Sequence, residues 1–191
     1  PNRSVGITEE LMNARSLWLT PQTTTPYVHA EIDVKDGPVV IEIGTPVLGF
    51  VNDAFFRYVT DLGVVGADKG KGGKYLLVGP DYEGEIPEGY FVSKTSTYRH
   101  WALMRIAAKP GETKEAIEAF KKTFKIYPLA NANNPEPTGF INLSNKQYNT
   151  IHANDASIYD ELNEVIQYEP ATAWDPELVG LAGAIGIKKG Q

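Results

Sequence analysis

The sequence contains no cysteine, which excludes a disulfide framework, a thiolate metal site and a cysteine nucleophile. It also lacks any run approaching the roughly 18 apolar residues that a membrane-spanning helix needs. Basic residues are outnumbered, and the formal net charge of -6 argues against a nucleic-acid-binding surface, which is usually basic. The chain begins at Pro1 without a methionine or a visible leader, so we expect a processed or truncated segment.

The residues that are present have an ordinary globular composition. Hydrophobic residues make up 42% and charged residues 22%, values that argue against disorder. A chain of 191 residues is long enough to bury a core without disulfides or metals. The absence of cysteine fits an exported protein, and it fits many cytosolic proteins as well.

Short runs with a strand-like pattern, separated by glycine and proline turns, fill residues 21–108. They lie at 27–34, 39–43, 51–61, 75–78, 90–93 and 100–107. The first two, joined by a turn, are interpreted as a hairpin, and the third places Asp53, Arg57 and Asp61 on one face. Short strands at this spacing predict a mainly β fold, an antiparallel sandwich or barrel-like domain.

Helical spacing replaces this pattern after Pro110. It predicts helices near 112–126, 155–168 and 175–185, the last with a cap and a proline at its start. The side chains expected to face the core are Phe120, Phe124, Leu162, Ile166, Leu178 and Leu181. The overall class is therefore α+β, with a β-rich domain and N-terminal extension at 1–110 and a helical appendage at 111–191. Residues 4–20 give an ambiguous helical pattern, and 131–145 are expected to form a polar loop.

Several motifs occur in an order that resembles a bacterial family, the domain of unknown function 1254. They are Thr20-Pro21, Asp36-Gly37-Pro38, Asp53, Thr60-Asp61, the run from Asp68 to Pro80, Ser96-Thr97-Tyr98, Arg105, Tyr127-Pro128-Leu129 and Ile185 to Gly190. The most specific is the run from Asp68 to Pro80. The family usually carries an Asn after the first Thr-Pro and an Asp-Thr soon after, where this chain has Gln22 and Thr24-Thr25.

The resemblance implies a larger protein. Family members usually continue into a second, C-terminal domain numbered 1214, so the chain is expected to lead toward a missing partner domain. They are often exported, which implies a periplasmic or secreted location. The family has no agreed activity. Since a shared interface would be left open, we also expect a second chain or a homo-oligomer to cover an apolar patch.

Tyrosine, histidine and arginine on predicted strand faces are the candidate catalytic residues. They are Tyr27, His29, Arg57, Tyr98 and His100, and the candidate substrate-binding residues are Lys69, Lys71, Lys74 and Arg105. Such groups serve β-elimination of uronate polysaccharides, where a cation neutralises the sugar carboxylate and a tyrosine or histidine moves protons. A polar exterior face of an antiparallel sheet would give the same pattern.

Cofactor and metal motifs are not found. The glycine-rich run from Gly66 to Lys74 lacks the spacing of a phosphate-binding P-loop, because Tyr75 follows Lys74. The three histidines, His29, His100 and His152, lack the spacing of a helical metal site. No serine lies in a G-x-S-x-G context. We therefore expect neither a cofactor nor a metal.

Two functions from different classes remain open. One is a carbohydrate-active enzyme that resembles alginate lyases and acts on an acidic polysaccharide. The other is a non-catalytic envelope or ligand-binding module that interacts with its partner domain. A cleft that gathers the five candidate catalytic residues would favour the enzyme, and their dispersal would favour the module.

Overall fold

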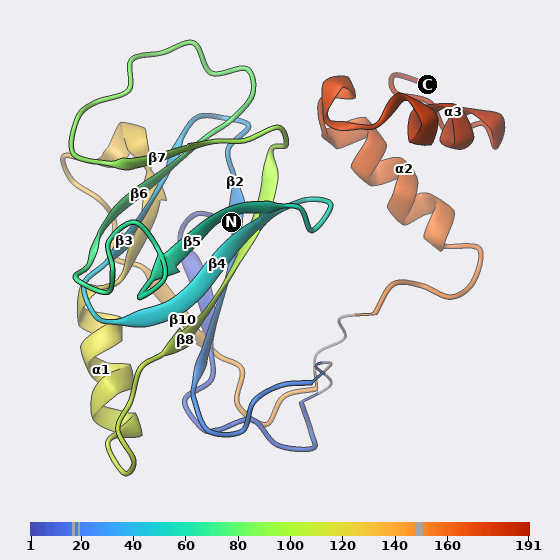
Figure 1. Ribbon diagram of the computed structural model, residues 1–191. Helices are drawn as coiled ribbons and strands as arrows, with labels where there is room; N and C mark the ends of the chain where they lie inside the picture. The colour runs from blue at the N-terminus through green and yellow to red at the C-terminus, as the bar shows by residue number, and fades with distance from the viewer. Residues whose placement is uncertain (17, 19, 148–150) are drawn as a thin grey trace.

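The computed structural model describes residues 1–16, 18, 20–147 and 151–191, in which two β-sheets pack as a sandwich (Figure 1). The six-stranded sheet has the order β10-β1-β2-β8-β4-β5, with bounds Gly139–Asn142, Ser4–Ile7, Tyr27–Asp33, Arg99–Ile106, Val47–Asp53 and Tyr58–Gly63. The four-stranded sheet has the order β7-β6-β3-β9, with bounds Phe91–Lys94, Gly73–Val78, Val39–Ile43 and Lys125–Pro128.

Most neighbouring strands are antiparallel. The exceptions are the pairs β1–β10 and β6–β7, which are parallel. The described strands form two open sheets and do not close into a barrel. The predicted fold class, mainly β with helices at the C-terminal end, is confirmed in its sandwich form.

The core lies between the two sheets and is closed at one end by helix α1, Thr113–Thr123. On β8, His100, Ala102, Met104 and Ile106 are buried and alternate with more exposed residues, as a sheet with one covered face requires. Helix α1 buries Phe120, which stacks on Phe124 at a ring separation of 4.7 Å. The predicted burial of both phenylalanines is confirmed.

Two predictions about strand pairing are wrong. The runs 27–34 and 39–43 do not form a hairpin, because β2 pairs with β8 in one sheet and β3 with β6 and β9 in the other. The run 51–61 is not one strand, because a turn at 54–57 separates β4 from β5. Asp53 and Arg57 therefore flank a turn and do not share a strand face with Asp61.

Three short strands were not predicted from the sequence. Strand β1 lies in the segment with the ambiguous helical pattern, β10 lies in the expected polar loop, and β9 follows α1 directly. Strands β1 and β10 pair with each other, so each depends on a partner far away in the chain. The sandwich thus extends past residue 110, since α1, β9 and β10 all belong to it.

The predicted helices are present as α1, α2 (Ile158–Tyr168) and α3 (Pro176–Ala184). Asp175 caps α3, and its side chain accepts a hydrogen bond from the Glu177 amide. Ile166 is buried and Leu162 is half-buried. Leu178 and Leu181 are 52% and 62% exposed, so the prediction that they face the core is wrong. No helix in the described part of the chain is long and apolar enough to cross a membrane.

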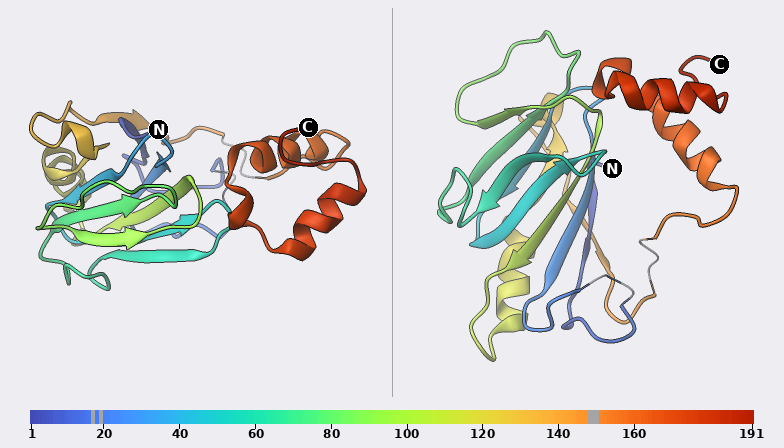
Figure 2. Two further views of the ribbon diagram at one scale, coloured as in Figure 1. Left: turned by 90° about the horizontal axis from the view of Figure 1, so that it is seen from above. Right: turned by 45° about the vertical axis from the view of Figure 1, so that its right-hand side comes forward.

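Residues 158–191, which we call the C-terminal arm, lie to one side of the sandwich (Figure 2). The main contact that holds the arm is made by Glu169, which is 0% exposed. Its carboxylate accepts hydrogen bonds from the amides of Tyr98 at 2.6 Å and Arg99 at 3.1 Å. Burial raises the pKa of Glu169, while these bonds oppose the rise. The arm is thus anchored to the start of β8.

Weaker contacts surround this anchor. Arg99 pairs with Glu164 at 3.0 Å, and the Tyr168 hydroxyl bonds to Asp33. The rings of Phe55 and Trp174 meet edge to face at 4.5 Å. Within the arm, the Lys189 ammonium donates to three backbone carbonyls at the end of α2, those of Ile166, Gln167 and Glu169. This lysine closes the helix end beside the anchor.

Replacing Glu169 by alanine should release the arm and leave the sandwich folded. The change leaves two backbone amides without their acceptor, at a cost of about 3 kcal/mol in arm docking. Hydrogen exchange should accelerate in α2 and α3 and stay slow in β3 and β6. Glu164→Ala, which removes an exposed ion pair, should have an effect of at most about 1 kcal/mol. Unchanged protection of α2 in the Glu169 variant would contradict this account.

Candidate functional site

The outward face of the six-stranded sheet carries the chemically richest side chains of the sandwich. They are Tyr27, His29, Glu31 and Asp33 on β2, Arg99, Trp101, Leu103 and Arg105 on β8, and Leu48, Phe50 and Asn52 on β4. The register places Trp101 directly between Glu31 on one side and Asn52 on the other. These cross-strand neighbours are close enough to interact.

Trp101 is the centre of an aromatic group on this face. Its ring lies 5.1 Å from Phe56, 5.4 Å from Phe50 and 5.7 Å from His29, measured between ring centroids. Trp18 extends the group, with its ring 6.1 Å from that of His29. The indole Nε1 of Trp101 is buried and lacks a hydrogen-bond partner among the described residues. The group therefore offers ring faces and one unsatisfied donor.

A hollow of about 600 Å³ lies where this face meets the arm. Strand β2 and the first residues of β8 form one side, the turn after β4 a second, and α2 with Glu169 a third. The lining residues are Pro1, Glu31, Ile32, Asp33, Asp53, Ala54, Phe56, Arg99, His100, Trp101, Val165 and Glu169. Aromatic rings and ionised groups thus line one space, as in many ligand sites.

Asp53 organises the turn that presents Phe56. The carboxylate is 3% exposed and accepts from the amides of Phe55 at 2.8 Å and Arg57 at 2.9 Å. The Arg57 Nε donates to its other oxygen at 2.6 Å. Phe56 adopts a φ of 61, a left-handed conformation that costs about 1 kcal/mol or more in a residue other than glycine. The turn therefore imposes the position of this ring, which is 71% exposed.

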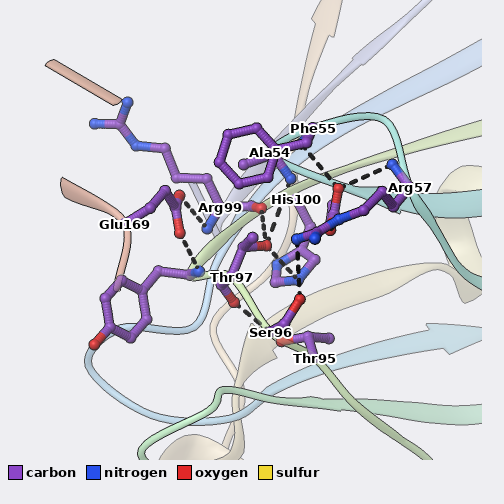
Figure 3. A network of polar contacts seen from close by, with 11 residues as sticks. Ala54, Phe55, Arg57, Thr95, Ser96, Thr97, Arg99, His100 and Glu169 are labelled. Atoms are coloured by element: carbon purple, nitrogen blue, oxygen red, sulfur yellow. Dashed lines mark hydrogen bonds and ion pairs between the residues drawn. The ribbon is translucent and has the colours of Figure 1, made fainter. Parts of the chain in front are cut away.

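A polar network connects this turn with the anchor of the arm (Figure 3). Arg57 Nη2 donates to Ser96 Oγ at 3.1 Å, and the Thr97 hydroxyl donates to the Arg99 carbonyl at 3.0 Å. The next amides, those of Tyr98 and Arg99, hold Glu169. The turn, the start of β8 and the arm are thus coupled by hydrogen bonds.

His100 lies beneath this network, on the inward side of β8, and also lines the hollow. It is 4% exposed, and burial lowers its pKa to about 4 against the opposing effect of Asp53. The ring is therefore neutral at pH 7. Its Nε2 lies 3.4 Å from Thr97 Oγ1, and its Nδ1 has no partner in the part of the chain that the structure describes.

The structure brings together three of the residues proposed from the sequence: Tyr27, His29 and Arg105. The Arg105 guanidinium lies over the Tyr27 ring at 5.6 Å. His29 is half-buried, and burial lowers its pKa although Glu31 acts in the opposite direction. Tyr27 is buried, and its hydroxyl accepts a hydrogen bond from the Gln22 amide at 2.9 Å.

Two other candidates lie elsewhere. Arg57 is held in the β4–β5 turn by Asp53. The Tyr98 hydroxyl is bonded to Asp81, and that bond, with burial second, raises the pKa of Tyr98 to about 12. With His100 on the inward side of its strand, the five candidate catalytic residues do not converge on one cleft.

The lysine-rich loop between β5 and β6 folds around a buried carboxylate. Asp68 accepts a bond from the Gly72 amide at 3.0 Å and another from the Tyr75 hydroxyl, whose pKa burial raises to about 12. Lys69, Lys71 and Lys74 are exposed, and none of them lines the hollow under the arm. This arrangement gives the loop a structural role.

Comparison with models of protein families places the chain in one family. The model described as "Protein of unknown function (DUF1254)" matches residues 2–128. The chain belongs to this family. The resemblance read from the motifs is thus confirmed, and a comparison with curated proteins found no match.

A solved structure shares the fold of this DUF1254 chain. The crystal structure of the VPA0106 protein from Vibrio parahaemolyticus is similar with a TM-score of 0.67 and 15% sequence identity. The similarity covers 90% of this chain and 43% of that one. The chain therefore spans less than half the length of that protein, and the likeness concerns the fold alone.

Four important residues of this DUF1254 site were not proposed from the sequence: Glu31, Phe56, Trp101 and Glu169. The alternation of inward and outward residues along β8 could have indicated Trp101, because it places the indole on the sheet face opposite to His100. Phe56 and Glu169 gave no such signal, since a turn and a distant helix end position them. In the described residues, no group of three or more His, Asp or Glu side chains is arranged to hold a metal ion.

Acid should destabilise this DUF1254 domain through His100. Its pKa falls from 6.5 in the unfolded chain to about 4 when folded, so protons bind the unfolded state more readily. The free energy of unfolding should therefore decrease by about 3 kcal/mol as the pH drops from 6.5 to 4. Urea titrations across this range should show that His100→Gln lacks this component. An equal pH slope in the variant would contradict the assignment.

Proposed function

We propose that this domain is a non-catalytic binding module that holds a carbohydrate chain on the outward face of its six-stranded sheet. The observation that carries the proposal is the pair of rings, Trp101 and Phe56, at the hollow of about 600 Å³. The strained turn at Asp53 holds the Phe56 ring against Trp101 while leaving the residue 71% exposed, so most of this apolar side chain is open to a ligand.

Sugars suit this chemistry. Each sugar ring has an apolar face of C–H groups that stacks on an aromatic side chain, and a rim of hydroxyls that bonds to polar groups. Glu31 and Asp33, which line the hollow, supply acceptors for these hydroxyls. A location outside the cytoplasm, as expected above, suits a polysaccharide ligand.

The scatter of the candidate catalytic residues supports a module rather than an enzyme. Catalysis by Tyr27, His29, Arg57, Tyr98 and His100 would require their reactive atoms to reach one substrate bond. His100 is enclosed, and the side chains of Arg57 and Tyr98 are engaged with Asp53 and Asp81. Binding requires only the exposed face.

The arm supplies the second half of the proposal, a docking surface. Helix α3 exposes Leu178, Val179 and Leu181, and Ile185 follows at its end. A patch of this kind on a soluble domain usually marks an interaction site. We propose that it contacts the partner domain of the family or, in its absence, a second copy of the chain.

Loss of the rings should weaken carbohydrate binding. Trp101→Ala and Phe56→Ala should each lower affinity about 10-fold, because each removes one stacking surface. Isothermal titration calorimetry with a panel of neutral, acidic and amino-bearing oligosaccharides would measure the effect. Tyr159→Ala, which removes an exposed ring on α2 outside the hollow, is the matched control and should bind normally. Equal affinities in all four proteins, or no binding by the wild type, would refute the proposal.

One observation favours a second candidate, the β-elimination of uronate chains. Tyr27, His29 and Arg105 adjoin on the outward face, with Arg105 also lining a smaller hollow of about 190 Å³. On this face Arg105 would neutralise the sugar carboxylate and neutral His29 would accept the C5 proton. As the C4–C5 double bond forms and the C4–O bond breaks, Tyr27 would protonate the leaving oxygen.

An ultraviolet assay for unsaturated uronates tests this candidate. If the chemistry operates, acidic polysaccharides give rising absorbance, and His29→Gln slows the reaction by about 100-fold. His152→Gln replaces an exposed histidine far along the chain and should leave the rate unchanged. Constant absorbance with the wild-type protein would reject the lyase and leave the binding module in place.

A further inference from the structure

Acidic side chains outnumber basic ones in the lining of the hollow. Glu31, Asp33 and Glu169 line it, and among the described residues none of these carboxylates forms an ion pair with a lysine or arginine. Asp33 accepts a hydrogen bond from the Tyr168 phenol and Glu169 from two backbone amides, and the Arg99 guanidinium interacts electrostatically with both carboxylates. Glu31 is exposed on the strand next to Trp101.

The basic side chains in or near the hollow each contact an acidic or aromatic side chain. Arg99 pairs with Glu164 at 3.0 Å, and Arg57 with Asp53 at 2.6 Å. The Lys35 ammonium lies over the Tyr168 ring at 4.1 Å, outside the lining. Four carboxylates, those of Glu31, Asp33, Asp53 and Glu169, thus line the hollow beside the Arg99 guanidinium and the Pro1 amino group, and this excess of acidic groups disfavours an anionic ligand.

The aromatic rings at the hollow also favour a positively charged ligand. The rings of Trp101 and Phe56 lie 5.1 Å apart, with an interplanar angle of 47°. The face of an aromatic ring is electronegative, and tryptophan attracts a cation most strongly. Two ring faces beside an exposed carboxylate form a receptor for a positively charged group.

We infer that the ligand of this hollow carries positive charge, and that the sugar proposed above bears free amino groups. This inference rests on the proposed function, since it specifies the class of carbohydrate. A protonated amine would lie between Glu31 and the ring of Trp101, with Asp33 beyond. An acidic polysaccharide, the ligand expected from the basic and aromatic residues of the sequence, would meet like charge here.

Two oligosaccharides with the same skeleton test the inference. An oligomer of glucosamine carries free amines, and the matching oligomer of N-acetylglucosamine is neutral. At a mildly acidic pH that keeps the amines protonated, calorimetry should show the glucosamine oligomer binding about 10-fold more tightly. Glu31→Gln should lower affinity for the charged oligomer about threefold to fivefold, and affinity for the neutral one by a smaller factor because the Gln oxygen still accepts a hydrogen bond. The variant keeps the shape of the side chain, so its fold is preserved.

The control is Glu88→Gln, which makes the same change of net charge at an exposed position outside the hollow. It should bind both oligomers as the wild type does. Tighter or equal binding of the neutral oligomer, tighter binding of a uronate oligomer, or no effect of Glu31→Gln would overturn the inference while the binding module stands. Equal binding of an oligolysine would overturn it too, because charge alone would then suffice. If no oligosaccharide binds, the proposed function fails with it.

Discussion

The hydrogen bonds of one buried carboxylate hold the two parts of this molecule together. Glu169 comes directly after α2, yet it accepts from two backbone amides at the start of β8. A charge with no exposed surface is costly unless such donors satisfy it, so the interaction is specific to this one position of the arm. This contact places α2 beside the start of β8, where Val165 and Glu169 form the third wall of the hollow.

A second buried carboxylate, Asp53, controls the opposite wall. Its hydrogen bonds hold a turn in which Phe56 adopts a left-handed conformation, and Arg57 ties that turn to Ser96. The segment that bonds to the turn is the same segment that receives Glu169. Hydrogen bonds and one short segment, 96–99, thus connect the arm to the turn that carries Phe56.

Charge and shape give different information about the ligand. In the sequence, Lys69, Lys71 and Lys74 suggested an anionic ligand. In the structure their loop folds around Asp68, and none of the three lysines lines the hollow. At the hollow itself, carboxylates outnumber the basic groups, and the rings of Trp101 and Phe56 lie among the lining residues. The net charge of the sequence thus describes the whole surface, whereas a bound ligand interacts with the few charged groups within about 10 Å of it.

Local patterns in the sequence were sufficient for the mainly β class, the three helices and the family, because hydrophobic period and capping residues act over a few positions. They did not suffice for β1, β9 and β10, which are four residues each and are stabilised by pairing with distant strands. Nor did they reveal that Leu178 and Leu181 are exposed, since an amphipathic pattern does not say what covers it. The site depended still more on tertiary structure. Trp101, Phe56 and Glu169 come from a strand, a turn and a helix end, and only their packing creates one surface from them.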